Sequence, residues 1–120
     1  VNVTYASNNV RDALRPVGNL NPLEEALILS YGAHMDTIED FTTLLLMSTY
    51  NGAKALRLGK YGLEPGCSAD FVVLDAPNPS AAVVGLAEKN YVFKAGRLMA
   101  SSRVVVNTYN GNQLQEVQES

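Results

Sequence analysis

The sequence predicts a mixed α/β fold in which a strand, a long loop and helices precede a small β layer. Apolar and polar residues alternate over residues 1–5, which is typical of a short strand. Apolar residues then recur at helical spacing over residues 22–58. A continuous apolar run at residues 71–75 and a hairpin pattern at residues 91–100 predict the β layer.

Capping signals predict where the helices begin. Asn21, with Glu24 three residues later, predicts a capping box at the start of a helix over residues 22–34. A threonine and an aspartate three residues apart predict a second start, for a helix over residues 38–50. A short third helix is expected to end at Gly59.

The second half of the chain is predicted to be mainly β. The run at residues 71–75 is typical of a strand that is buried on both faces. A loop with a short central element separates it from the hairpin, and residues 103–109 favour a further strand. The amide-rich, acidic tail from Asn110 is expected to be frayed, or helical only in context.

Composition excludes several classes of function. A chain of 120 residues with 47% hydrophobic content can build one packed core. Its net charge of -3 offers no basic surface for nucleic acid or anionic membrane. With Cys67 as its one cysteine, the chain forms no internal disulfide, and a cytoplasmic location is expected. The sequence contains no apolar run of the ~20 residues that span a bilayer, so no membrane partner is expected.

The stretch at residues 8–15 has the clearest features of a functional site. Asn8 and Asn9 follow a strand and precede a long loop and a helix, where α/β barrels place their active sites. The alternative is that both asparagines cap a turn, because Asn commonly bonds its own backbone. The residue pattern by itself favours this turn interpretation.

Three motifs resemble the cytosine deaminase branch of the amidohydrolase superfamily: "SNNVRDALRPVGNLNPLEEA", "STYNGAKALRLGKYGLEPGCSADFVVLDAP" and "YVFKAGRLMAS". The resemblance implies the C-terminal fragment of a metal-dependent (β/α)8 barrel hydrolase that cleaves ring C–N bonds. Residues 1–60 would supply the last barrel strand and its helices. Residues 61–109 would form part of the appended small β-sandwich, and residues 110–120 a polar tail.

The resemblance places Asn8 where the family has a catalytic aspartate. It implies a divalent metal, zinc or iron, held by histidines on earlier strands, with that aspartate completing the metal site. A metal lowers the pKa of its bound water toward ~7, and a nearby carboxylate can take and return the proton. An amide oxygen can ligate a metal, but it cannot exchange a proton at neutral pH. We therefore expect general-base catalysis to be lost. Asn8 stays a candidate metal ligand through its amide oxygen, but this fragment is expected to bind no metal because the family's histidine ligands lie on earlier strands.

The same resemblance makes three neighbours of Asn8 candidate substrate-binding residues. Asn9 is an alternative match to the family aspartate, and it is also an amide. Asp12 matches a second acid of the motif, and we expect it to brace the loop through Arg11 or backbone amides. Leu14 lies near a position that family members fill with a bulky residue, where it would form an apolar wall.

His34 and Cys67 are each the single residue of their type, and structural roles are expected for both. His34 lies near a predicted helix end, where a cation is favourable, and metal sites of this type need several nitrogen ligands together. Cys67 lies in a glycine-flanked turn with no neighbouring histidine to act as its base.

Two hypotheses follow. In the first, the chain belongs to a hydrolase of small heterocyclic substrates such as cytosine, isocytosine, creatinine-like or triazine-like rings, and is inactive by itself. In the second, it is a non-catalytic α/β module with a degenerate site that self-associates. Exposed strand edges favour pairing with another chain, so a homo-oligomer is expected under either hypothesis.

Overall fold

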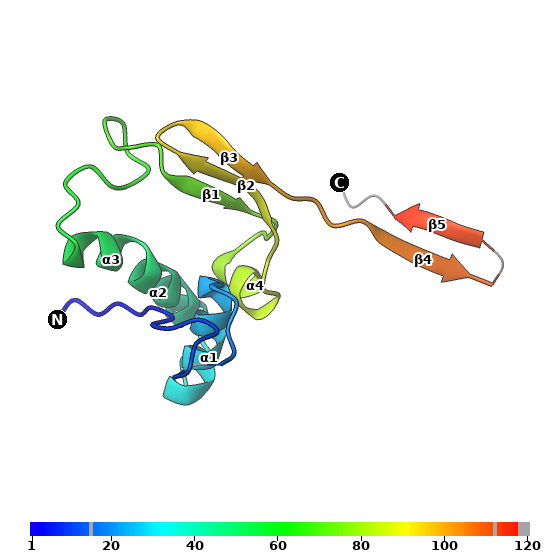
Figure 1. Cartoon of the computed structure of the whole chain (residues 1–120), viewed down its shortest axis with the longest axis horizontal. Helices are drawn as coiled ribbons and strands as arrows, with labels where there is room; N and C mark the ends of the chain where they lie inside the picture. The colour runs from blue at the N-terminus through cyan, green and yellow to red at the C-terminus, as the bar shows by residue number, and fades with distance from the viewer. Residues whose placement is uncertain (15, 112, 118–120) are drawn as a thin grey trace.

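The computed structural model describes residues 1–14, 16–111 and 113–117, and it confirms a mixed α/β composition. Along the chain the elements are α1 (Pro22–Ala33), α2 (Ile38–Ser48), α3 (Tyr50–Ala55), β1 (Phe71–Leu74), α4 (Pro79–Val84), β2 (Lys89–Lys94), β3 (Arg97–Ser101), β4 (Val106–Asn110) and β5 (Gln113–Val117). The helices gather below a small sheet of β1, β2 and β3, and the β4–β5 hairpin projects from this body (Figure 1).

Helix α1 begins where the sequence predicted, but without the predicted capping box. The Asn21 side-chain oxygen accepts a hydrogen bond from the Leu23 N–H at 3.2 Å, which confirms Asn21 as the N-cap. Glu24 does not close the predicted capping box. The Asn21 N–H donates instead to Asn19 Oδ1 at 2.9 Å, because the preceding turn brings this nearer oxygen to it.

The other two predicted helices are also present. The capping box of α2 is complete, because the Thr37 N–H donates to Asp40 Oδ2 at 3.0 Å and the Asp40 N–H donates to Thr37 Oγ1 at 3.2 Å. Helix α3 ends earlier than predicted, at Ala55. Arg57, with φ of 57°, takes the left-handed position after the helix that had been expected of Gly59.

One hydrophobic core joins α1, α2 and α4. Its buried residues are Leu23, Ala26, Phe41, Leu44, Met47, Ala82, Val83 and Ala87. Leu44 and Val83 are completely buried. The core therefore takes side chains from both sides of the predicted domain boundary at residue 60, and that boundary stays a prediction.

The sheet has the order β1-β2-β3, with both pairs antiparallel. The predicted hairpin is confirmed, and its turn residues Ala95 and Gly96 both have the positive φ of a type I′ turn, 49° and 74°. The prediction that residues 71–75 are buried on both faces is wrong, because no second sheet layer covers β1 within the described residues. Phe71 is 36% exposed and Val72 47% exposed.

The predicted N-terminal strand is not formed: residues 1–9 have no regular secondary structure. A strand needs a neighbour that pairs with its backbone. Within the described residues no strand lies beside this segment.

The C-terminal region differs from the prediction in a further respect. The strand expected at residues 103–109 is confirmed as β4, which pairs antiparallel with β5 from Val106 opposite Val117 to Asn110 opposite Gln113. The expectation of a frayed or context-dependent helical tail is therefore wrong over residues 113–117, where backbone pairing in the hairpin is formed. Residues 118–120 lie outside the described part of the chain.

Among the residues that the structure describes, no helix has the length and apolar character needed to cross a membrane.

Candidate functional site

The segment before Asn8 is held against the helices by side-chain hydrogen bonds. Thr4 Oγ1 donates to the Met47 carbonyl at 2.6 Å. The Asn51 side chain donates to the Val3 carbonyl at 2.8 Å, and the Asn2 side chain donates to the Asn51 carbonyl at 2.9 Å. The loop that carries the candidate residues therefore starts from a segment that is fixed against α2 and α3.

Tyr5 continues this attachment at the start of α1. Its hydroxyl donates to the Pro22 carbonyl at 3.1 Å. Burial raises the pKa of Tyr5, the Ser48 hydroxyl bond lowers it, and the charge of Glu25 raises it again. Tyr5 borders a cavity of about 130 Å³, whose lining residues are Tyr5, Ala6, Ser7, Leu20, Pro22, Glu25 and Ser48. Tyr5 therefore stays neutral at physiological pH.

Asn8 and Asn9 lie at the start of the loop. Asn8 is exposed and has φ of 61°, a left-handed conformation that Asn tolerates better than most residues. Asn9 is half-buried. Asn8 is not among the residues that line the Tyr5 cavity, so Glu25 does not share that cavity with it. The left-handed backbone at Asn8 supports the interpretation that this asparagine caps a turn. Its catalytic role stays a prediction.

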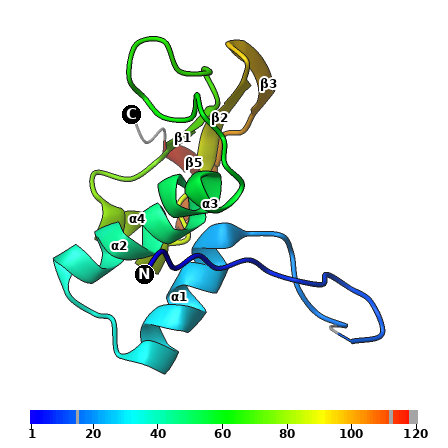
Figure 2. The ribbon, with the colours of Figure 1, turned by 90° about the vertical axis from the view of Figure 1, so that its left-hand side faces the viewer.

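The loop after Asn9 stands out from the helices (Figure 2). Arg11 Nε donates to the Gly18 carbonyl at 3.1 Å, which joins the two sides of the loop. Asp12 Oδ1 accepts the Leu14 N–H at 2.9 Å, in agreement with the expected bracing through a backbone amide. The Leu14 side chain is 85% exposed. Residue 15, the last of the predicted site stretch, lies outside the described residues.

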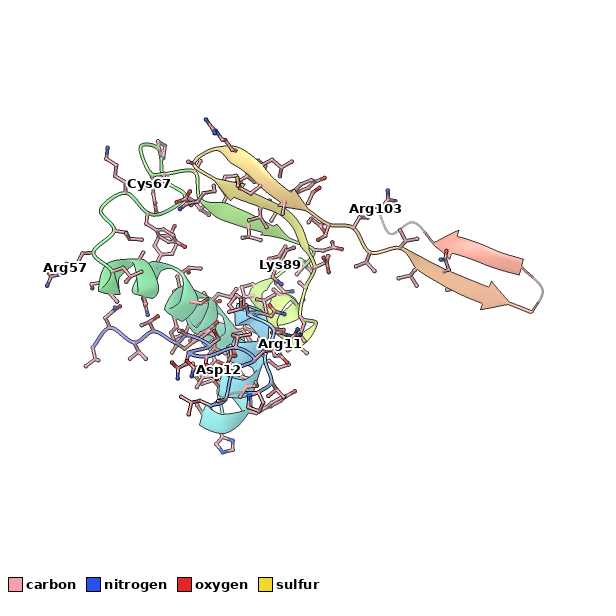
Figure 3. The ribbon with its side chains drawn as sticks, viewed as in Figure 1. Arg11, Asp12, Arg57, Cys67, Lys89 and Arg103 are labelled. Atoms are coloured by element: carbon pink, nitrogen blue, oxygen red, sulfur yellow. The ribbon has the colours of Figure 1, made fainter. Side chains whose placement is uncertain are left out.

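His34 and Cys67 do not come together with these loop residues. His34 is the C-cap of α1 with φ of 53°, so the 12 residues of that helix separate it from the loop. Cys67 lies well apart from Arg11 and Asp12 (Figure 3), and its thiol donates to Glu64 Oε2 at 3.7 Å. Both placements agree with structural roles.

The described residues do not supply a metal centre of their own. Within residues 1–14, 16–111 and 113–117, His, Cys, Asp and Glu form no cluster of three or more. Asn8 offers one amide oxygen, and a divalent metal in this chemistry needs several oxygen or nitrogen ligands together. The donor set of the described chain therefore does not fit a bound divalent metal.

One contact near the loop had no signal in the sequence. Lys89 Nζ, at the start of β2, donates to Asn21 Oδ1 at 3.1 Å across 68 positions of the chain. A lysine at the first position of a strand is common in sequences and predicts no particular contact. The two side chains meet only because the sheet packs on α1. This contact links the β layer to the end of the site loop.

Comparisons with known proteins agree on one family. Residues 6–99 match the Amidohydrolase family. The chain is 36% identical over 107 residues to N-isopropylammelide isopropyl amidohydrolase of Pseudomonas sp. (strain ADP), covering 88% of this chain and 27% of that protein.

Solved structures give the same result. A 5-methylcytosine deaminase from Klebsiella pneumoniae, liganded with 5-fluorocytosine, matches with a TM-score of 0.84 and 32% identity, covering 91% of this chain and 27% of that one. N-isopropylammelide isopropylaminohydrolase from Burkholderia multivorans ATCC 17616 matches with a TM-score of 0.72 and 29% identity, covering 77% of this chain and 24% of that one. The chain spans about a quarter of the length of these relatives. Because the family match extends over most of its residues, this chain belongs to the amidohydrolase family.

Proposed function

We propose that this chain is the C-terminal part of a metal-dependent hydrolase that cleaves C–N bonds of a small heterocyclic compound. The observation that carries the proposal is the 36% identity, over 88% of the chain, to a protein named as an isopropyl amidohydrolase of N-isopropylammelide. The structural match to a 5-methylcytosine deaminase liganded with 5-fluorocytosine supports the same class of ring substrate. We place the ligands of the zinc or iron in the part of the relatives that this chain does not cover.

In this proposal residues 1–60 contribute the last strand and helices of a (β/α)8 barrel, and residues 61–109 part of a small β-sandwich. Two observations support this arrangement. Residues 1–7 run without strand partners and are bonded to the helices through side chains, as a barrel strand would be once separated from its neighbours. Apolar side chains of β1 are also left exposed, as expected when a second sheet layer is missing.

Asn8 would then stand where a carboxylate exchanges the proton of the attacking water. A neutral amide has no proton-accepting capacity at neutral pH, so the step that needs a general base loses its acceptor. We therefore propose that the chain with Asn8 is impaired even when the rest of the barrel is present, and inactive by itself.

The test is Asn8→Asp in the longer hydrolase, with Asn9→Asp as the matched control. Release of ammonia or amine is measured on a panel of cytosine-like and triazine-like rings. Asn8→Asp is expected to raise kcat/KM by about 100-fold or more, because a positioned general base typically contributes that much. Asn9→Asp should give no comparable gain. A gain from Asn9→Asp alone would show that the aligned residue is Asn9, and no turnover by any variant would contradict the hydrolase assignment.

A second candidate function, a self-associating module without catalysis, is favoured by the free edges of the three-stranded sheet. Within the described residues β1 and β3 each pair on one side only, and Val72 and Leu98 are about half exposed. Sedimentation velocity over a range of concentrations tests this candidate. A homo-oligomer that persists on dilution, together with no activity after Asn8→Asp in the longer protein, would favour the module over the hydrolase.

A further inference from the structure

Lys89 makes an unusual contact between the β layer and the start of α1. Its side chain is half-buried, and Nζ donates to the side-chain oxygen of Asn21 at 3.1 Å. Figure 3 shows Lys89 between the sheet and the part of the molecule that carries Arg11. The contact joins residues that are 68 positions apart, so it depends on the way the sheet packs on the helices.

The electrostatics of this position do not favour a cation. The N-terminus of a helix carries a partial positive charge, which disfavours a nearby ammonium group. Among the described residues, Lys89 forms no ion pair with a carboxylate, unlike Lys94, which pairs with Asp70. Its partner is a neutral amide. The stability of α1 therefore gives no reason for a lysine at this position. Lys89 is instead connected to the site loop through Asn21.

The hydrogen bonds of Asn21 connect this lysine to the loop. Its side-chain oxygen accepts both from Lys89 and from the Leu23 N–H, and its own N–H donates to Asn19 Oδ1 at 2.9 Å. Since both partners of that oxygen are donors, they fix the orientation of the amide group. Asn21 is thus held at three points where the site loop ends and α1 begins.

The other side of the loop is joined to the same end. Arg11 Nε donates to the Gly18 carbonyl, close in sequence to Asn19 and Asn21. Asn9, Asp12 and Leu14, which the sequence resemblance makes candidates for substrate contact, are therefore connected through this short stretch to Lys89. A shift at Asn21 would move the end to which the loop is anchored.

We propose that Lys89 is a positioning residue, which fixes the C-terminal end of the loop over residues 9–20 and so sets where that loop meets the substrate. The proposal rests on the proposed function, because it takes this loop as part of the substrate site. Lys89 bonds to Asn21, which follows the loop, so its effect on the reaction is indirect. The β layer thereby acts on the site through one hydrogen bond.

The first test needs no activity. Hydrogen–deuterium exchange of this chain is compared for the unsubstituted protein, Lys89→Met, Lys89→Arg and the control Lys60→Met, which alters an exposed lysine. Lys89→Met is expected to speed exchange over residues 17–23 by roughly tenfold, because a hydrogen bond from a charged donor is lost. Lys89→Arg should restore slow exchange, and Lys60→Met should leave it unchanged.

Two outcomes of this test would overturn the proposal. One is unchanged exchange over residues 17–23 in Lys89→Met. The other is faster exchange spread equally over α2 and the sheet, which would mean a general loss of stability. If Lys89→Met does not fold, Asn21→Ser gives the same test, because serine keeps the N-cap but its shorter side chain does not reach Lys89. Asn21→Ser should then speed exchange over the same residues, and slow exchange there would contradict the proposal.

The second test measures kinetics in the longer hydrolase that carries Asn8→Asp. Lys89→Met is expected to raise KM about tenfold with little change in kcat, because the loop is misplaced while the reacting groups are intact. Lys89→Arg should restore KM. An unchanged KM in an active enzyme that carries Lys89→Met would contradict the positioning role. Absence of activity in the Asn8→Asp parent contradicts the proposed function instead, and the exchange test still decides whether Lys89 holds the loop.

Discussion

The helical layer and the three-stranded sheet are built from similar apolar residues but bury them to very different degrees. Leu44 of α2 and Val83 of α4 are fully buried, whereas Phe71, Val72 and Val73 of β1 are 36%, 47% and 40% exposed. Helices α1, α2 and α4 cover one another within this chain. The sheet has no second layer among the described residues, so its apolar side chains stay exposed.

The largest expected difference between the two layers comes from truncating a leucine in each. Leu44→Ala should lower the free energy of unfolding by about 3 kcal/mol, because it leaves a cavity in a fully buried site. Leu98→Ala in β3 should cost less than about 1 kcal/mol, since Leu98 is 54% exposed. Urea unfolding followed by circular dichroism measures both. Equal losses would contradict the contrast and would mean that Leu98 is covered in solution, for example by a second copy.

Helix capping provides a smaller test within the helical layer. Thr37→Ala removes the N-cap hydroxyl of α2 and should lower stability by about 1 kcal/mol. Thr43→Ala, at an exposed position in the same helix, is the matched control and should be neutral or slightly stabilising. The same unfolding measurement applies. A cost for Thr43→Ala as large as that for Thr37→Ala would show that the cap is not the cause.

Asp40 accepts a backbone N–H at the start of α2, and a carboxylate beside the sheet accepts one in the hairpin turn. Asp70 accepts from Lys94 Nζ at 2.6 Å and from the Ala95 N–H at 2.7 Å, and these bonds, the lysine first, hold its pKa below the ordinary 3.8. A lowered native pKa adds stability above the unfolded pKa, and this stability is lost as pH falls through the native value. The hairpin should therefore loosen on acidification below about pH 4.

The amide signal of Ala95, followed by NMR from pH 6 to pH 2, measures this smallest effect. The signal should shift as Asp70 gains a proton and releases the Ala95 N–H. Asp70→Asn removes the titrating group and should flatten the curve over the same range. An identical curve in the variant would assign the titration to another carboxyl group and remove Asp70 from the comparison.

Much of the fold could be predicted from local sequence, because the relevant interactions are local. Asn21 and Thr37 predict helix starts because each bonds to a backbone N–H within the next three residues. Ala95-Gly96 predicts a tight turn because glycine readily adopts the positive φ that such a turn requires. The end of α3 was missed because Arg57 takes the left-handed position before Gly59 is reached. Glu24 was assigned a bond that a nearer side chain, Asn19, makes instead.

The candidate site was predictable only in part. The motif around Asn8 identified the loop and indicated the family, which the match over residues 6–99 confirms. The resemblance also led us to expect that Asp12 braces the loop, and its bond from the Leu14 N–H agrees with this expectation. The roles of Asn8, Asn9 and Leu14 in catalysis and substrate binding stay predictions.

The sequence by itself determined where α1 and α2 begin, the hairpin and the family, since each depends on spacing within a short window or on motifs in order along the chain. The tertiary structure decided which apolar strands are covered, that residues 1–9 have no strand partner, and that Lys89 meets Asn21. These features depend on which surfaces pack together. No local sequence pattern predicts a contact between residues that are 68 positions apart, so only the tertiary structure shows it.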